Sequence, residues 1–506
     1  MLCRRDFLKA IGLGAAAVAL PRLLTAGAAP AKRPNILYIM SDDHASAAIS
    51  AYGGILDKVA PTPNIDRIGQ RGMRLENCFV TNSICTPSRG CIMTGQYSHK
   101  NGVYTLADPL DPERPNVAKY LQQAGYQTAI FGKWHLHKDP TGFDEWIILP
   151  GQGIYHDPGF IHKDGSRKKH TGYVSDLITD FSLEFLKKRD PAKPFFLMCH
   201  HKAPHRPWEP AARHATLFDG VTMPEPANLL DHYENRSHAA ANAKLRVGEN
   251  MTKTDVKQDI PKDLAPDDLR KWGYQLYIKD YLRCIRAVDE NVGRLLDYLD
   301  KEGLAENTVV IYTSDQGFFL GEHGWYDKRF IYEESLRMPF LVRYPPEIAA
   351  GSTNKDFMLN ADFAPTFLDW AGRPAAPPEM QGRSFRANLS GKTPADWRTS
   401  MYYRYWMHLA DHNVPAHYGL RTQKYKLIFY YGLPLGTSGS LKTPTDPEWE
   451  LFDLEKDPHE MKSVYADPAY AQVVKDLKAE LLRLKAAVGD SDEPYPDLVE
   501  LTKKHW

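Results

Sequence analysis

A cysteine and an arginine four residues apart are the most informative pair in this chain. Cys85 is followed by Pro87 and Arg89 in the segment Cys-Thr-Pro-Ser-Arg. Since proline is tolerated in the first helical turn, we expect a short helix here with Cys85 and Arg89 on one face near its N-terminus. Free backbone N–H groups, the helix dipole and a guanidinium all favour an anion. The segment predicts a sulfur nucleophile at an anion site. An ordinary buried cysteine in a turn would give the same sequence pattern and is the alternative.

Short apolar runs elsewhere in the chain end in charged or imidazole side chains. Continuous hydrophobicity in such runs indicates strands buried on both faces, as in a parallel sheet. Helical patterns lie between the runs, and this alternation predicts a doubly wound α/β sheet flanked by helices. The apolar runs are residues 35–40, 127–132, 194–199 and 308–314, and the helical patterns include residues 63–71, 116–124, 174–188 and 276–301.

Four oxygen-bearing side chains follow two of the predicted strands. Ligands bind beyond the carboxyl ends of strands in such sheets, so these side chains are expected to share one rim. Carboxylate and amide oxygens suit a hard cation such as Ca²⁺ or Mg²⁺. The candidate metal ligands are Asp42, Asp43, Asp315 and Gln316.

Positive and imidazole side chains should reach the same rim. Arg89, Lys133 and Lys328 would supply positive charge for an anionic substrate. His135 and His205 can move protons near neutral pH. An anion site with its own metal predicts transfer of a sulfuryl or phosphoryl group.

Together these motifs resemble those of the type I sulfatases of the alkaline phosphatase superfamily. The similarity extends over about residues 33–480, nearly the whole mature chain. It implies a large alkaline-phosphatase-like mixed sheet and a smaller C-terminal α+β subdomain with an antiparallel sheet. The matching segments are residues 42–43, 85–89, 132–135, 203–205, 314–317 and Lys328.

The resemblance also implies roles for individual residues. A formylglycine-generating maturation enzyme would oxidise Cys85, and a hydroxyl of the hydrated aldehyde would attack sulfur. One Ca²⁺ per chain would be held by Asp42, Asp43, Asp315, Gln316 and the modified Cys85. Arg89 and Lys133 would steady the sulfate, His135 would accept a proton, and His205, the expected general acid, would face the leaving oxygen with Lys328. Many relatives carry asparagine at Gln316, which leaves the geometry of this ligand open.

A narrower similarity links four segments to bacterial N-acetylglucosamine-6-sulfatases. It implies removal of 6-O-sulfate from N-acetylglucosamine at the end of a sulfated glycan. His323 is an expected substrate contact because it lies just before Lys328 in the chain. The aromatic and basic cluster at residues 402–412, with Arg404, His408 and His412, is expected to bind a sulfated sugar, and a strand packed on the main domain is the alternative. Alternatives are a sulfatase for another sugar position, a phosphonate or phosphate diester hydrolase, and a non-catalytic sulfoglycan-binding protein. The segments are residues 41–44, 203–208, 320–329 and 417–422.

The N-terminus resembles a twin-arginine export signal over residues 1–31, which predicts a periplasmic or secreted protein. The apolar run at residues 10–20 is too short to span a bilayer, which takes roughly 20 residues. Acidic and basic side chains number 63 each, so no global field favours nucleic acid or stable membrane insertion.

The length predicts two domains, a catalytic one at residues 32–381 and a C-terminal one at residues 382–506. The charged stretch at residues 235–270 is expected to be a surface insertion. Four cysteines besides Cys85 should remain in the mature chain. They lack metal-ligand spacing, so buried free thiols are expected, with one disulfide as the alternative.

Overall fold

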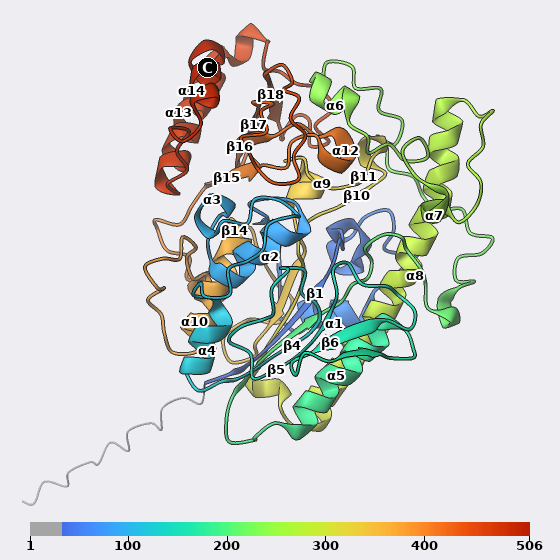
Figure 1. The fold of residues 1–506 in the computed structure, drawn as a ribbon, viewed down its shortest axis with the longest axis vertical. Helices are drawn as coiled ribbons and strands as arrows, with labels where there is room; N and C mark the ends of the chain where they lie inside the picture. The colour runs from blue at the N-terminus through green and yellow to red at the C-terminus, as the bar shows by residue number, and fades with distance from the viewer. Residues whose placement is uncertain (1–32) are drawn as a thin grey trace, which may run out of the picture. The chain divides into compact units, whose positions relative to one another are not determined.

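The computed structural model describes residues 33–506 (Figure 1). Its central sheet contains ten strands. The predicted export signal lies outside these described residues. The mixed sheet confirms the predicted fold class. Its strands, in spatial order, are β13 (Ser352–Asn354), β2 (Met73–Leu75), β12 (Phe340–Arg343), β9 (Thr308–Ser314), β1 (Asn35–Ser41), β8 (Phe195–His200), β4 (Gln127–Lys133), β5 (Glu145–Leu149), β6 (Gly159–His162) and β7 (Arg167–Lys169).

The strands that carry the predicted chemistry end at the same edge of this sheet. β1 lies between β8 and β9 and is parallel to both, and every residue of β1 is buried. Ser41 pairs with Ser314, so the residues that follow them, Asp42 and Asp315, emerge next to each other. His200 pairs with Gly132 of β4, which places Lys133 at the same edge. The parallel register therefore brings residues far apart in the sequence to one rim.

Helices cover both faces of the sheet (Figure 1). Leu37 and Ile39 of β1 belong to the core beneath helices α5 and α8, whereas Tyr38 and Met40 belong to the core beneath α2 and α10. Since successive side chains point to opposite faces, one continuous apolar strand serves both layers. The principal helices are α1 (Pro63–Gln70), α2 (Cys85–Thr94), α4 (Val117–Gln123), α5 (Val174–Lys188), α8 (Pro266–Lys301) and α10 (Phe363–Trp370).

A second, antiparallel sheet of four strands is built from the C-terminal part of the chain. Helix α13 packs against this sheet, in agreement with the predicted strands and terminal helix. Residues 33–506 nevertheless form one compact unit. The strands are β15 (Ser400–Tyr405), β16 (His417–Thr422), β17 (Tyr425–Tyr430) and β18 (Glu448–Asp453), followed by α13 (Ala471–Ala487) and α14 (Pro496–His505).

Shorter elements complete the described chain. Those near the site include β10 (Phe319–Leu320), β11 (Tyr326–Asp327), α9 (Glu333–Leu336) and α12 (Ala410–Asn413). The others are β3 (Cys78–Phe79), α3 (Ser98–Asn101), α6 (His238–Asn242), α7 (Lys253–Val256), β14 (Met358–Leu359) and α11 (Arg386–Leu389).

The segment at residues 235–270 differs from its prediction as a surface insertion. Leu245 and Val247 are fully buried, and each belongs to one of the two cores. Helix α8 begins ten residues before the predicted start, at Pro266, where proline occupies the first turn. The prediction is wrong for residues 237–251, where apolar side chains pack inward, whereas residues 257–269 are largely exposed and Leu264 is 40% exposed.

The cysteines Cys78, Cys85, Cys91, Cys199 and Cys284 are free and buried. This agrees with the expected free thiols. Within residues 33–506, no helix is long and apolar enough to cross a membrane.

Candidate active site

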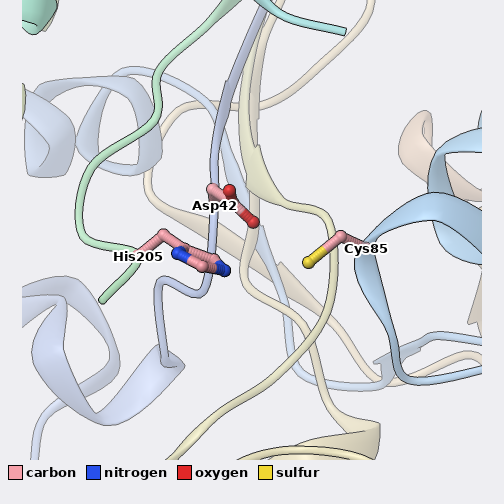
Figure 2. A group of neighbouring side chains, drawn as sticks. All are labelled: Asp42, Cys85 and His205. Carbon is pink, nitrogen blue, oxygen red and sulfur yellow. The ribbon is translucent and has the colours of Figure 1, made fainter. Parts of the chain in front are cut away.

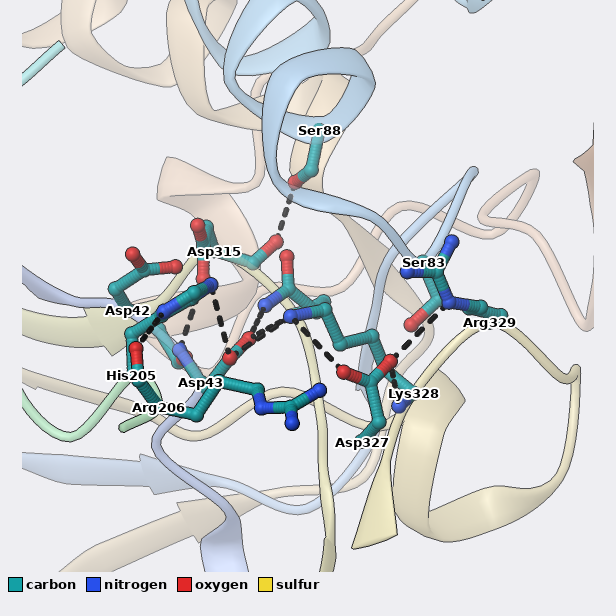
Figure 3. A network of polar contacts seen from close by, with 12 residues as sticks. Asp42, Asp43, Ser83, Ser88, His205, Arg206, Asp315, Asp327, Lys328 and Arg329 are labelled. Atoms are coloured by element: carbon teal, nitrogen blue, oxygen red, sulfur yellow. Dashed lines mark hydrogen bonds and ion pairs between the residues drawn. The ribbon is translucent and has the colours of Figure 1, made fainter. Parts of the chain in front are cut away.

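Helix α2 begins at Cys85, and side chains near its start form hydrogen bonds to residues at the ends of two central strands, β4 and β9. Arg89 donates from Nε to Oδ2 of Asp315 at 2.9 Å and from Nη1 to the carbonyl oxygen of Lys133 at 2.6 Å. Ser88 donates from its hydroxyl to the carbonyl oxygen of Asp315 (Figure 3). The helix start predicted around Cys85 and Arg89 is therefore confirmed, and it lies directly over the rim of the sheet.

A cluster of buried carboxylates forms the floor of the site. Oxygens of Asp42, Asp43 and Asp315 lie within 4.8 Å of one another. Asp42 Oδ1 and Gln316 Oε1 are buried without a hydrogen-bond partner, while the amide nitrogen of Gln316 donates to Asp43. Like charges this close repel unless a cation lies between them. Unpartnered oxygens in an all-oxygen set fit a hard divalent cation.

The pKa values of the three clustered carboxyl groups also favour a bound cation. Burial, together with the neighbouring Asp42, raises the pKa of Asp315 to about 7. Burial also raises the pKa of Asp43 to about 6, against the opposing effect of Lys328. Burial alone would raise the pKa of Asp42 too, but Lys133, His205 and Arg89 hold it well below its usual range. A bound cation would remove the cost of ionising Asp43 and Asp315 side by side.

Two lysines contact these carboxylates from different sides. Lys328 Nζ lies 2.7 Å from Oδ1 and 2.8 Å from Oδ2 of Asp43. Lys133 Nζ donates to Asp42 Oδ2 and to the side-chain oxygen of Gln152. Positive charge thus surrounds the position next to Cys85, as the sequence predicts.

Cys85 faces one of these carboxylates and a histidine (Figure 2). The sulfur of Cys85, an oxygen of Asp42 and a ring nitrogen of His205 lie within 4.8 Å of one another. His205 Nδ1 is 2.7 Å from the carbonyl oxygen of Arg206, which can only accept, so Nδ1 carries a proton and Nε2 faces the site. Burial and the charge of Lys133 lower the pKa of His205, which favours a neutral ring until an anion binds beside it.

His135 lies at the end of β4, against the first turn of α2. Its Nδ1 is 3.4 Å from the hydroxyl oxygen of Thr86, next to Cys85 in the chain. Burial and Lys133 lower the pKa of His135 well below its usual value. A neutral imidazole at this position can accept a proton.

A pocket of about 310 Å³ opens beside Cys85. Figure 3 shows a network that runs from Asp43 through Lys328 to Asp327 and Arg329. Asp327 and Arg329 adopt positive φ angles of 78° and 97°, which bulky residues rarely do. The lining residues are Ile84, Cys85, Leu106, Gln152, His205, Arg206, Asp327, Lys328, Arg329, Asp411 and His412.

Several of these lining residues were not assigned a role from the sequence. Asp327 and Arg329 flank Lys328 directly, and that run of charges was the available signal. His412, by contrast, was expected to bind sugar as part of the aromatic and basic cluster at residues 402–412, and this end of the cluster lines the pocket. Arg206 follows His205 in one of the segments that resemble N-acetylglucosamine-6-sulfatases, whereas Gln152 carries no local pattern that marks it.

Three residues predicted to contact the substrate, Arg404, His408 and His323, do not line this pocket, so these predictions are wrong. Arg404 is buried, forms a bidentate pair with Asp490 at 2.8 and 2.9 Å, and stacks on Trp406. His408 is buried, with Nε2 2.9 Å from the carbonyl oxygen of Thr443.

His323 is likewise fully buried, with Nδ1 3.1 Å from Oδ2 of Asp231. All three side chains stabilise the packing of loops and the second sheet. None of the three lines the pocket beside Cys85, so none contacts a substrate bound there.

Comparison with known proteins identifies the family. A model of the sulfatase family matches residues 34–373, well over half of the chain. The chain belongs to the sulfatase family. A second model, the C-terminal region of N-sulphoglucosamine sulphohydrolase, matches residues 321–487 of the sulfatase.

Relatives of the sulfatase include enzymes that act on glucosamine derivatives. An N-acetylglucosamine-6-O-sulfatase of Bacteroides thetaiotaomicron is 43% identical, over 92% of this chain and 89% of the relative. The human N-acetylglucosamine-6-sulfatase is 29% identical, over 75% of this chain and 68% of the relative.

A solved structure in complex with its substrate, D-glucosamine-2-N,6-O-disulfate, matches with a TM-score of 0.86 and 42% identity, covering 92% of this chain and all of that one. The protein is a sulfuric ester hydrolase of the glycan-degrading kind, as predicted.

Proposed function

We propose that this sulfatase removes the 6-O-sulfate from N-acetylglucosamine at the end of a sulfated glycan. The observation that carries the proposal is the pocket beside Cys85. Its volume of about 310 Å³ is near the lower end of the roughly 300–1,000 Å³ typical of ligand pockets. A small pocket with the nucleophile at one end suits a single terminal sugar whose sulfate projects from the ring.

The wall opposite the carboxylate cluster would recognise the sugar. Arg206, Asp327, Arg329, Asp411 and His412 offer both donors and acceptors there. Sugar hydroxyl groups both donate and accept hydrogen bonds, so a mixed set suits them. The named activities of the relatives point to the same substrate class.

Cys85 is proposed to act after oxidation to formylglycine. Burial and the adjacent Asp42 raise the pKa of the Cys85 thiol, so the unmodified thiol would carry almost no thiolate at neutral pH. The Pro87 and Arg89 that follow it complete the segment expected to be recognised by the maturation enzyme.

Other residues of the site would bind the metal ion and the sulfate group. Asp42, Asp43, Asp315 and Gln316 would hold one Ca²⁺, which would polarise the sulfate. Arg89 and Lys133 would bind the anion and orient it toward residue 85.

The proton transfers are assigned to two histidines. His135 would accept a proton at its neutral imidazole as sulfate is released from residue 85. His205 would donate from Nε2 to the leaving sugar oxygen once the bound anion favours its charged form, with Lys328 on the same side.

The decisive experiment is a screen of defined sulfated saccharides. The matured protein with Ca²⁺ should release sulfate, detected by ion chromatography, from 6-sulfated N-acetylglucosamine faster than from 3-sulfated N-acetylglucosamine or 6-sulfated galactose. The Cys85→Ala variant is the control for contaminating activity. Rapid release from another sugar alone would overturn the substrate assignment.

The same screen tests the remaining alternatives. A phosphonate monoester hydrolase of Agrobacterium radiobacter shares the fold with a TM-score of 0.71, at 21% identity. Adding a phosphonate monoester to the panel therefore tests that chemistry directly. Binding of a sulfated sugar without any turnover would indicate a non-catalytic binding protein.

We also propose that the protein is exported to the periplasm or beyond. The paired arginines of residues 4–5 support this. Cell fractionation of a strain expressing the full chain, with an Arg4→Lys, Arg5→Lys variant as control, tests the proposal. Equal export of both forms would contradict a twin-arginine route.

A further inference from the structure

Gln152 lies in the wall of the pocket on a short loop between β5 and β6. Leu149, the last residue of β5, pairs in parallel register with Lys133 of β4. The chain then turns back through Gly151 and Gly153, which have φ angles of 52° and 67°. A Cβ atom at Gly153 would meet Leu149 Cδ1 at 2.8 Å, and together with the positive φ this favours glycine there. The turn carries Gln152 back over Lys133.

The amide of Gln152 has a defined orientation. Its Oε1 accepts a hydrogen bond from Lys133 Nζ, and an ammonium group can only donate, so the oxygen must face Lys133. Within residues 33–506, Nε2 of Gln152 makes no hydrogen bond. The group lines the same pocket as Cys85 and His205, so Nε2 is the donor left for a bound molecule.

The neutral charge of Gln152 matters as much as its position. Lys133 already contacts one carboxylate, Asp42, which offsets its charge. A second carboxylate in place of Gln152 would leave Lys133 little net attraction for a sulfate. An amide oxygen holds the ammonium without adding negative charge.

We propose that Gln152 is a positioning residue for Lys133 that also donates its amide N–H to the sulfate group of the substrate. It holds the ammonium toward the anion from one side while Asp42 holds it from the other. This inference rests on the proposed sulfatase site and adds a residue to its sulfate-binding end.

The test compares three variants of the matured, Ca²⁺-loaded protein. Gln152→Met keeps the side-chain volume but removes both polar atoms. Gln152→Glu keeps the acceptor for Lys133 but removes the donor and adds charge. Gln70→Met, at an exposed position at the end of α1, is the matched control.

The measurements are kcat and KM for 4-nitrophenyl sulfate, and the inhibition constant of inorganic sulfate. Losing hydrogen bonds to charged groups should lower kcat/KM of Gln152→Met by roughly tenfold to a hundredfold. Inhibition by inorganic sulfate should weaken in Gln152→Met and at least as much in Gln152→Glu. Thermal unfolding and bound calcium should match the parent protein in both.

Two results would overturn the proposal. Unchanged kcat/KM and unchanged inhibition by sulfate in Gln152→Met would show that Gln152 has only a structural role in its loop. Full activity in Gln152→Glu would show that the acceptor alone suffices and that Nε2 does not contact the anion. Neither result depends on which sugar sulfate the parent protein prefers, because the probe substrate and inorganic sulfate carry no sugar.

Discussion

Lys328 forms a bidentate contact with Asp43, at 2.7 and 2.8 Å, and its Nζ also lies 3.9 Å from Oδ2 of Asp327. One ammonium therefore connects the carboxylate floor to the wall that would recognise the sugar. The fully buried position of Asp43 and the near-complete burial of Lys328 keep this contact shielded from solvent. Changes at the cation position and at the sugar wall should consequently affect each other.

Replacing Cys85 tests the nucleophile. Cys85→Ser offers a hydroxyl in place of the thiol but cannot be converted by the same oxidation, so activity should fall by about a thousandfold or more. Co-expression with a formylglycine-generating enzyme should raise the activity of the parent protein, and intact mass should show the conversion. Full activity in Cys85→Ser would exclude the proposed role.

Removing the cation tests the carboxylate cluster. Chelation, or Asp315→Asn, should lower turnover by about a hundredfold or more, since changes beyond the direct ligands already cost metal sites roughly tenfold to a hundredfold. Calcium content measured by elemental analysis should fall from one ion per chain to none in Asp315→Asn. One retained ion in this variant would place the cation elsewhere.

The pH dependence of metal stabilisation follows from the raised pKa values. Asp43 and Asp315 have folded-state pKa values of about 6 and 7, above those of an unfolded chain. Without a cation, the protonated Asp43 and Asp315 stabilise the folded state below about pH 4. This stabilisation is lost as the pH rises toward 7 and the two carboxyl groups ionise.

Calcium should therefore raise the unfolding temperature more at pH 7.5 than at pH 5. Differential scanning fluorimetry with and without calcium measures this difference, and comparing loaded with chelated protein at each pH cancels other titrating groups. An equal calcium effect at both pH values would contradict the assignment.

His205 can be separated from the other catalytic residues by the choice of leaving group. His205→Ala should reduce turnover of a 6-sulfated sugar by about 10² to 10⁴, the usual contribution of a general acid. An aryl sulfate should lose far less, because a phenolate leaves with little protonation. Equal losses on both substrates would remove His205 from this role.

Arg404 should act on stability rather than on substrate affinity. Arg404→Ala leaves Asp490 buried without its bidentate partner, and breaking such a pair costs about 3–5 kcal/mol. The unfolding temperature should drop while KM for the sulfated sugar stays constant. The variant Arg329→Ala should also lower the unfolding temperature, because Arg329 is buried and paired with Asp327, but since it lines the pocket it should in addition raise KM.

Residues next to strand ends could be predicted from the sequence. Asp42, Lys133 and Asp315 each follow an apolar run, and the parallel register of β1, β4, β8 and β9 necessarily brings such ends to one rim. Local patterns of this kind are sufficient because the side-chain chemistry and the strand that positions it are adjacent in the chain. The helix at Cys85 was predictable for the same reason.

The far wall of the pocket, by contrast, was decided only by tertiary packing. Arg206 reaches it from a loop and Asp411 from the short helix α12, while Gln152 lines the sulfate-binding end of the same pocket from another loop. No periodicity in the sequence connects these three residues. Arg404 looked like a sugar ligand in the sequence, yet Asp490, 86 residues later, pairs with it in the interior. The sequence by itself determined the reaction chemistry, whereas burial and long-range ion pairing, which depend on how the second sheet packs, decided which polar side chains remain free for the substrate.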